Sequence, residues 1–146
     1  MPNDPGRLES MLRRIRELGF RITPQRLAVL KFLAEGGGHP GAEEIHASVK
    51  ADFPTTTLAT VYKTLAVLKA VGQVLEIEFS GDHNRYDGKR IEPHPHLICI
   101  KCGRIMDSDC ESLASMTEKL ASRTGFKIVS HRLDFFGVCP RCQKER

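Results

Sequence analysis

The 146-residue sequence lacks the segments that would place a protein in a membrane or export it. No apolar run approaches the roughly 20 residues that cross a bilayer. Met1–Gly6 has no apolar core of the kind that a signal peptide contains. We therefore expect a cytoplasmic protein without a membrane partner. In a reducing cytoplasm paired cysteines bind metal more often than they form disulfides, and a total of five fits four ligands and one remaining thiol.

Internal repeats and low-complexity segments are also missing, and the length allows one ordinary domain or two small ones. A unit below roughly 80 residues usually needs a metal, a disulfide or a partner for stability. The net charge of +4 permits nucleic-acid binding without requiring it. Arginines are concentrated near the N-terminus, which fits either phosphate contacts or a solvated helix face. They are Arg7, Arg13, Arg14, Arg16, Arg21 and Arg26.

Apolar periodicity predicts four helices followed by a β-hairpin. Gly19 ends the first helix, Thr23 and Pro24 begin the second, and Thr57 caps the fourth. This order predicts a winged helix, an architecture that presents one helix to the DNA major groove. The apolar positions are Leu8, Met11, Leu12, Ile15 and Leu18, then Leu27, Leu30 and Leu33, then Ala42, Ile45 and Val49, and then Leu58, Val61, Leu65 and Leu68; the hairpin strands carry Leu75, Ile77 and Phe79, and Arg85–Asp87.

Residues 88–95 have two prolines and no clear period, and they predict a hinge between a winged-helix domain at 1–87 and a second domain at 96–146. The predicted fold class is α+β, with an N-terminal winged helix-turn-helix domain and a small C-terminal α/β domain. The elements expected in the second domain are strands at His96–Ile100 and Arg104–Asp107, a helix marked by Leu113, Met116 and Leu120 that ends near Gly125, and a long strand at Phe126–Val138.

Four residues of the fourth helix lie off its apolar stripe and are predicted to face outward: Thr60, Tyr62, Lys63 and Thr64. Small polar side chains, an aromatic ring and a lysine suit contacts with base edges and phosphates. Arg26, near the start of the second helix, suits a phosphate contact. Exposed helices also carry threonine and lysine routinely, and Tyr62 could simply cover the core. Together with the predicted hairpin, these residues favour double-stranded DNA as a partner.

Two Cys-x-x-Cys pairs, Cys99/Cys102 and Cys139/Cys142, predict a tetrahedral four-thiolate site. Zinc suits such a site best, and a closed shell of four ligands indicates a structural role. A thioredoxin-like dithiol is the alternative, but that motif needs one pair and a βαβ context that is missing here. Cys110 lies outside the pattern and is predicted to be an ordinary free thiol.

His94 and His96 lie two residues apart, each preceded by a proline, with Asp87 and Asp107 nearby and His39 before the third helix. Imidazole and carboxylate groups form a site that suits Fe(II), Mn(II), Ni(II) or zinc. The residues alone leave open the alternative that these are solvated hinge histidines.

Motifs along nearly the whole chain, from about Leu8 to Cys142, resemble the ferric uptake regulator (Fur) superfamily. The matching stretches are Arg21-Ile-Thr-Pro-Gln-Arg26, His39-Pro40, Ala59-Thr-Val-Tyr-Lys-Thr-Leu65, Arg85-Tyr86-Asp87, His94-x-His96-x₂-Cys99-x₂-Cys102-Gly103 and Gly137-x-Cys139-x₂-Cys142. The resemblance implies a dimeric winged-helix repressor that binds inverted-repeat, AT-rich operators when its regulatory metal is bound. The C-terminal domain is then also the dimerisation domain.

Within the superfamily the chain is most similar to the peroxide-responsive repressor branch. That resemblance implies a regulatory Fe²⁺ or Mn²⁺ site at His39, Asp87, His94, His96 and Asp107, beside a structural Zn²⁺. Asp107 favours this branch because iron-sensing members usually carry glutamate there. Pro93 and Pro95 replace two polar residues from which many members build a further metal site, although His131 matches another histidine of that site.

The function expected from this resemblance is peroxide sensing, in which Fe(II)-catalysed oxidation of a ligand histidine, His39 or His94, releases DNA. The alternative within the superfamily is an iron-, manganese- or zinc-responsive repressor without peroxide chemistry. Two histidines and a carboxylate also resemble the iron site of non-haem oxygenases, so an enzyme is a further alternative. We do not expect one, because the sequence has no co-substrate motif and an oxygenase would leave the N-terminal half without a function. A zinc-ribbon adaptor protein is the remaining alternative, and it predicts no metal-dependent affinity for an operator.

Overall fold

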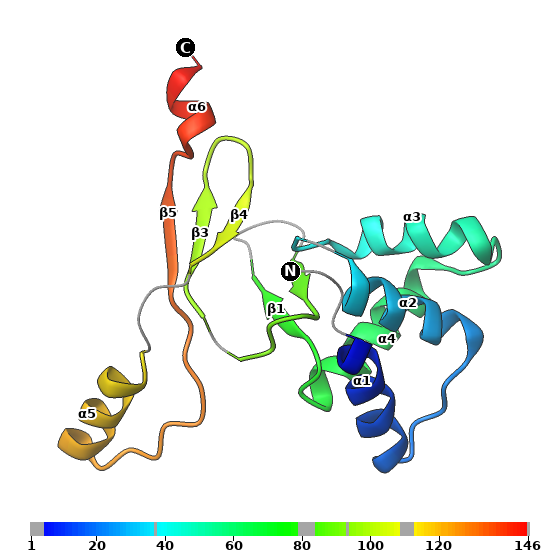
Figure 1. Ribbon diagram of the computed structural model, residues 1–146, viewed down its shortest axis with the longest axis horizontal. Helices are drawn as coiled ribbons and strands as arrows, with labels where there is room; N and C mark the ends of the chain where they lie inside the picture. The colour runs from blue at the N-terminus through cyan, green and yellow to red at the C-terminus, as the bar shows by residue number, and fades with distance from the viewer. Residues whose placement is uncertain (1–4, 37, 79–83, 93, 109–112, 146) are drawn as a thin grey trace. The chain divides into compact units, whose positions relative to one another are not determined.

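The computed structural model describes residues 5–36, 38–78, 84–92, 94–108 and 113–145, and it divides into two compact units, Met1–Glu92 and Pro93–Arg146 (Figure 1). Each unit is described by itself. The predictions for Phe79, for Cys110 and for the hairpin turn expected at 80–84, apart from its last residue Asn84, lie outside the described residues. No helix among the described residues is both long and apolar enough to span a bilayer.

The first unit contains four helices and a two-stranded sheet, which confirms the predicted winged-helix order. Its core contains Met11 and Ile15 from the first helix and apolar residues from the other three. The elements are α1 (Pro5–Glu17), α2 (Pro24–Glu35), α3 (Ala42–Asp52), α4 (Leu58–Ala70), β1 (Leu75–Ile77) and β2 (Arg85–Asp87).

Local sequence signals determine where these helices begin and end. The hydroxyl of Thr23 accepts the backbone N–H of Arg26 at the start of α2, and Thr57 accepts that of Thr60 at the start of α4. Gly19 and Gly72 follow α1 and α4 with positive φ angles of 79° and 72°, a conformation that glycine adopts at little cost. These caps confirm the predicted helix boundaries.

Leu27, an apolar position of the predicted second helix, is 38% exposed in the structure. The buried stripe of α2 is centred between Leu30 and Leu33, and at 100° per residue Leu27 lies at its edge.

The second unit is built on a three-stranded sheet of order β4-β3-β5 (Figure 1). Strand β3 pairs antiparallel with β4 and parallel with β5. Helix α5 ends at Gly125 in the left-handed conformation, as predicted. The elements are β3 (His96–Cys99), β4 (Ile105–Asp107), α5 (Ala114–Thr124), β5 (Asp134–Gly137) and α6 (Pro140–Lys144).

The predicted long strand at Phe126–Val138 is wrong, because only Asp134–Gly137 is a strand. Strand β5 is limited by its partner: the register of β3 offers four positions, from His96 to Cys99. Residues 126–132 have no paired strand among the described residues, and a strand cannot form a ladder of hydrogen bonds without one.

Among the described residues of the second unit, the buried ones are His94, Pro95, His96, Ile98, Cys99 and Cys142. Helix α5 buries none of its residues, and Met116 and Leu120, which mark this helix in the sequence, are 57% and 49% exposed in the single chain. A unit this small with so few buried side chains needs a metal or a partner for stability.

Candidate metal centres and DNA-binding helix

The four paired cysteines form one cluster in the second unit. Cys99 ends β3, Cys102 follows in a turn that Gly103 completes with a positive φ of 74°, and Cys139 and Cys142 lie at the start of and within α6. The N–H of Ile100 donates to the carbonyl of Gly137, so the parallel β3–β5 pairing carries the second cysteine pair to the first.

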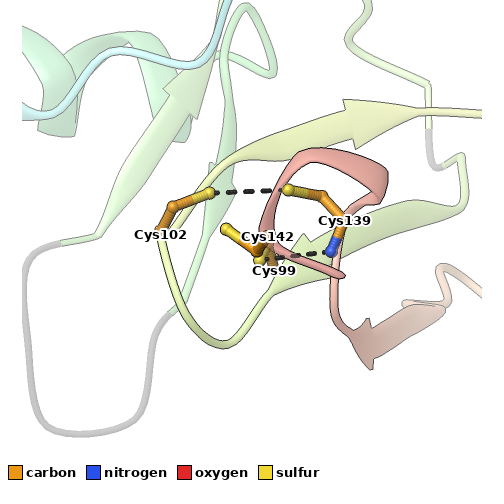
Figure 2. Close-up of side chains that lie close together, drawn as sticks. All are labelled: Cys99, Cys102, Cys139 and Cys142. Carbon is orange, nitrogen blue, oxygen red and sulfur yellow. Dashed lines mark hydrogen bonds between the residues drawn. The ribbon is translucent and has the colours of Figure 1, made fainter. Parts of the chain in front are cut away.

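Figure 2 shows the four thiol groups directed towards a common centre. Their sulfur atoms all lie within 4.8 Å of one another, and Cys102 Sγ is 3.9 Å from Cys139 Sγ. A tetrahedral zinc site with bonds of about 2.3 Å requires sulfur–sulfur distances on the order of 3.8 Å. The cluster therefore fits a four-thiolate zinc site.

Backbone hydrogen bonds favour the thiolate form of two of these cysteines. The N–H of Cys139, 3.3 Å from Cys99 Sγ, and that of Cys102 lower the pKa of the Cys99 thiol to about 6. The N–H of Cys142 lowers the pKa of Cys139. The hydrogen bond with Cys139 raises the pKa of Cys142 to about 12 in the metal-free cluster. Thiolates are the metal-binding form of cysteine, so the fold favours the ligand state at Cys99 and Cys139.

A second set of candidate metal ligands lies at the other end of the same sheet. His94 Nε2 is 2.8 Å from Asp107 Oδ1, and His96 Nε2 is 3.7 Å from the same oxygen. His96 and Asp107 are direct partners in the β3–β4 register, and the ring centroids of the two histidines are 4.4 Å apart. Both histidines are buried, at 5% and 4% exposure. The alternative of solvated hinge histidines is therefore wrong for His94 and His96.

The two remaining predicted ligands, His39 and Asp87, meet within the first unit. The N–H of Tyr86 donates to the carbonyl of Pro40, and Gly41 forms a bridge with Arg85. The segment before α3 therefore runs beside β2, and His39 Nε2 lies 3.5 Å from Asp87 Oδ2.

The Asp87 carboxylate is also held by its own backbone. Its Oδ1 accepts the N–H groups of Lys89 and Arg90, at 2.9 and 3.0 Å. Burial raises the pKa of Asp87, but the hydrogen bonds with His39, Arg90 and Lys89 outweigh it and lower the pKa below its ordinary value. The group is therefore an anion with its second oxygen directed to His39.

On α4, the predicted DNA-contacting residues do not all face outward. Tyr62 is 46% exposed, Lys63 is also exposed, and Thr60 is half-buried. Thr64 is only 1% exposed, and its hydroxyl donates to the carbonyl of Thr60 at 2.8 Å. The prediction that Thr64 faces outward is wrong, because threonine can satisfy its hydroxyl on the helix backbone and pack its methyl group in the core.

Two arginines of the N-terminal group serve the fold of the first unit. Arg26 is half-buried and donates to the carbonyl of Arg21 at 2.7 Å. Arg7 is 8% exposed and donates to the carbonyl of Gly88 and to both oxygens of Gln73. The sequence of the first helix contains several arginines, and no local feature indicated that Arg7 is the buried one.

Asp134 is a site residue that the sequence prediction missed. Its Oδ1 lies 3.3 Å from His96 Nδ1, and its Oδ2 accepts Arg132 at 2.6 Å. The spacing of Arg132 and Asp134, two residues apart, could have predicted that their side chains share one face of a strand. No local feature of the sequence indicated that this strand pairs with β3 beside His96. His131 Nε2 is buried without a hydrogen-bond partner among the described residues.

A family model described as the ferric uptake regulator family matches residues 17–136. The peroxide-responsive repressor PerR of Staphylococcus aureus is 37% identical over 136 residues, covering 93% of this chain and 91% of that protein. The ferric uptake regulator of Helicobacter pylori, whose structure is described as revealing three functional metal-binding sites, is similar with a TM-score of 0.82 and 27% identity, over 100% of this chain and 99% of that one. PerR from Streptococcus pyogenes matches with a TM-score of 0.53 and 30% identity, over 98% and 95% of the two chains.

Proposed function

Because the chain belongs to the ferric uptake regulator family, we propose that it is a dimeric, metal-dependent repressor of transcription that responds to peroxide. The observation that carries the proposal is the distribution of the ligands. His39 and Asp87 meet at the end of wing strand β2, whereas His94, His96 and Asp107 converge in the other unit. We propose that one regulatory ion takes ligands from both groups.

The donor set fits Fe(II) or Mn(II), since imidazole nitrogens and carboxylate oxygens suit both ions. In the second unit three donor atoms from His94, His96 and Asp107 lie within 4.8 Å of one another. Asp87, already an anion, supplies a further carboxylate from the first unit. The four cysteines hold structural zinc and leave the regulatory ion to the nitrogen and oxygen ligands.

Ligands on both sides of residues 88–95 couple metal binding to DNA binding. Asp87 belongs to the wing strand, so fixing its carboxylate relative to His94 and His96 restricts the orientation of α4. In a dimer, that orientation sets the spacing of two recognition helices against half-sites one helical turn apart. Metal shifts the population towards the DNA-competent form, and DNA tightens metal binding by the same factor.

The residues that contact DNA are proposed to be Thr60, Tyr62 and Lys63 on α4, with Arg26 at a phosphate. Thr64 has a supporting role, because its hydroxyl is bonded within the helix. The partner is an inverted-repeat operator bound by a homodimer.

The surface of the sheet supports a second copy of the chain as the dimer partner. Met106, Leu97 and Phe135 are direct neighbours across β4, β3 and β5, and they are 41%, 44% and 49% exposed. Side chains alternate between faces, so this apolar row lies opposite the face that carries His96. Contiguous apolar surface of this kind marks an interface between proteins.

Peroxide sensitivity depends on which ion the ligands hold. A bound Fe(II) would supply the reductant that converts peroxide to an oxidant beside the ligand imidazoles, whereas a bound Mn(II) would support repression without this chemistry. His39 or His94 would be the imidazole that is oxidised, and loss of its nitrogen as a ligand would weaken the regulatory site. The 37% sequence identity to the peroxide-responsive repressor of S. aureus supports a peroxide-sensing function.

Fluorescence anisotropy tests the proposal with a labelled inverted-repeat duplex selected from a random pool by the Mn(II)-loaded protein. The full-length, zinc-containing protein is loaded anaerobically with Fe(II) or Mn(II) and titrated before and after peroxide. We expect peroxide to release only the Fe(II) form, with one added oxygen on a peptide containing His39 or His94. Cysteine oxidation with intact histidines contradicts this mechanism.

A metal-availability repressor without peroxide chemistry is the second candidate function. The similarity to the H. pylori ferric uptake regulator over the whole chain favours it. Metal-dependent DNA binding that survives peroxide in both the Fe(II) and Mn(II) forms selects this candidate.

A further inference from the structure

A row of three polar side chains crosses the sheet of the second unit. In the β3–β4 register His96 is opposite Asp107, and in the β3–β5 register it is opposite Asp134. The imidazole therefore has a carboxylate on each side. Asp107 Oδ1 is 3.7 Å from Nε2, and Asp134 Oδ1 is 3.3 Å from Nδ1.

The Asp134 carboxylate is fixed from its other oxygen. Arg132 donates to Oδ2 at 2.6 Å, and only 11% of the Asp134 side chain is exposed. Charge-assisted hydrogen bonds of this length stabilise the ionised carboxylate and restrict its rotation. The remaining oxygen, Oδ1, is the one directed to His96.

The two nitrogens of His96 therefore face different partners. A neutral imidazole carries one N–H, and a hydrogen bond from that N–H determines which nitrogen keeps the free lone pair. If Nδ1–H donates to Asp134, the lone pair is on Nε2. That nitrogen lies on the side of Asp107 and His94, where the three donor atoms converge.

We propose that Asp134, held by Arg132, is a positioning residue that fixes the Nδ1–H tautomer and the ring orientation of His96 and so prepares Nε2 for the regulatory metal. The inference rests on the proposed function, because it requires His96 to be a metal ligand. A carboxylate that accepts the second ring N–H of a metal-binding histidine orients the ring and raises its basicity, and its loss typically costs about 10–100-fold in metal affinity. If Asp134 had a purely structural role, its carboxylate would only accept the hydrogen bond of Arg132 at the start of β5 and would not affect His96.

Mn(II) binding to the full-length, zinc-containing protein tests the inference without relying on peroxide or DNA. The free Mn(II) signal in electron paramagnetic resonance gives the dissociation constant. We expect Asp134→Ala to weaken Mn(II) binding by about 10–100-fold. Asp134→Asn keeps an acceptor oxygen without the charge and should lose less. Glu118→Ala, which removes an exposed carboxylate from α5 of the same unit, is the matched control and should bind as the wild type does.

Nitrogen NMR of the imidazole rings supplies a second measurement that a structural role would not change. In the protein without regulatory metal, the His96 resonances, assigned with His96→Gln, should report hydrogen on Nδ1 in the wild type and a shift towards the Nε2–H form in Asp134→Ala. Arg132→Gln should keep the Nδ1–H form and weaken Mn(II) binding less than Asp134→Ala does.

The outcomes separate this inference from the proposed function. Mn(II) binding by the wild type, with unchanged affinity and an unchanged His96 tautomer in Asp134→Ala, overturns the role of Asp134 alone. Failure of the wild type to bind Mn(II) overturns both. If Asp134→Ala does not fold, the isosteric Asp134→Asn decides, and wild-type affinity together with a wild-type tautomer in that variant overturns the inference.

Discussion

The guanidinium of Arg7, near the start of α1, donates to the carbonyl of Gly88, the first residue after wing strand β2 and 81 positions away. The same group donates to the side-chain and backbone oxygens of Gln73, between α4 and β1. Gly88 itself has no room for a side chain, because an added Cβ would lie 2.7 Å from Leu33 Cβ. Arg7 therefore joins three separate segments of the first unit at the end of the wing.

Arg7→Met should destabilise the first unit by about 2–3 kcal/mol, because it leaves buried acceptors at Gly88 and Gln73 without their donor. Denaturant unfolding followed by circular dichroism measures the change. Arg13→Met removes an exposed arginine from the same helix and is the control. Equal midpoints for the two variants would contradict the role of Arg7.

Removal of zinc should unfold the second unit, because few of its side chains are buried and the metal completes its core. Cys142→Ser, at a residue that is 3% exposed, should lose zinc in a colorimetric release assay and lose protection of β3 and β5 in hydrogen exchange. Cys110→Ser is the control and tests the predicted free thiol. Retention of one zinc by Cys142→Ser would contradict the four-thiolate site.

Leu97→Glu should weaken the dimer, because it places a charge in the middle of the apolar row between Met106 and Phe135. Analytical ultracentrifugation over a range of concentrations measures the shift from dimer to monomer. Leu18→Glu changes a residue of the first unit that is 47% exposed and should leave the dimer intact. An unchanged sedimentation profile for Leu97→Glu would place the interface elsewhere.

Lys63→Ala should weaken binding of the Mn(II)-loaded protein to all duplexes and reduce the slope of log affinity against log salt by about one, as expected for one phosphate contact. Thr64→Val should leave the affinity unchanged, since its hydroxyl bonds to Thr60 within α4. Lys127→Ala, an exposed lysine of the second unit, is the control. A larger loss from Thr64→Val than from Lys63→Ala would contradict the observed orientation of α4.

Tyr86 should ionise late in an alkaline titration. Burial first, and then the negative charge of Glu76, raise its pKa from 10.0 to about 12. The folded state keeps the proton that the unfolded chain loses, so the stability from Tyr86 is complete below pH 10 and falls between 10 and about 12. Tyr62→Phe leaves Tyr86 as the only tyrosine, because the chain has two, and the phenolate absorbance then reports it alone. A midpoint near 10 in the folded protein would contradict the burial.

Local features of the sequence were sufficient to predict the helix caps at Thr23 and Thr57, the order of helices and hairpin, and the two cysteine pairs. Each depends on residues within one or two turns of one another, where hydrogen bonding and backbone preference act without the rest of the fold. The candidate ligands of the regulatory ion came from the family resemblance, because the residues alone left open the alternative of solvated histidines.

The tertiary structure alone decided the buried positions of Arg7 and Thr64, the short length of β5 and the place of Asp134 beside His96. Polar side chains become buried where distant segments supply their partners, as Gly88 and Gln73 do for Arg7. A strand extends only as far as its neighbour offers backbone groups, so the register with β3 determines the length of β5. Asp134 meets His96 through the parallel register of strands 38 residues apart, a pairing that no local signal contains.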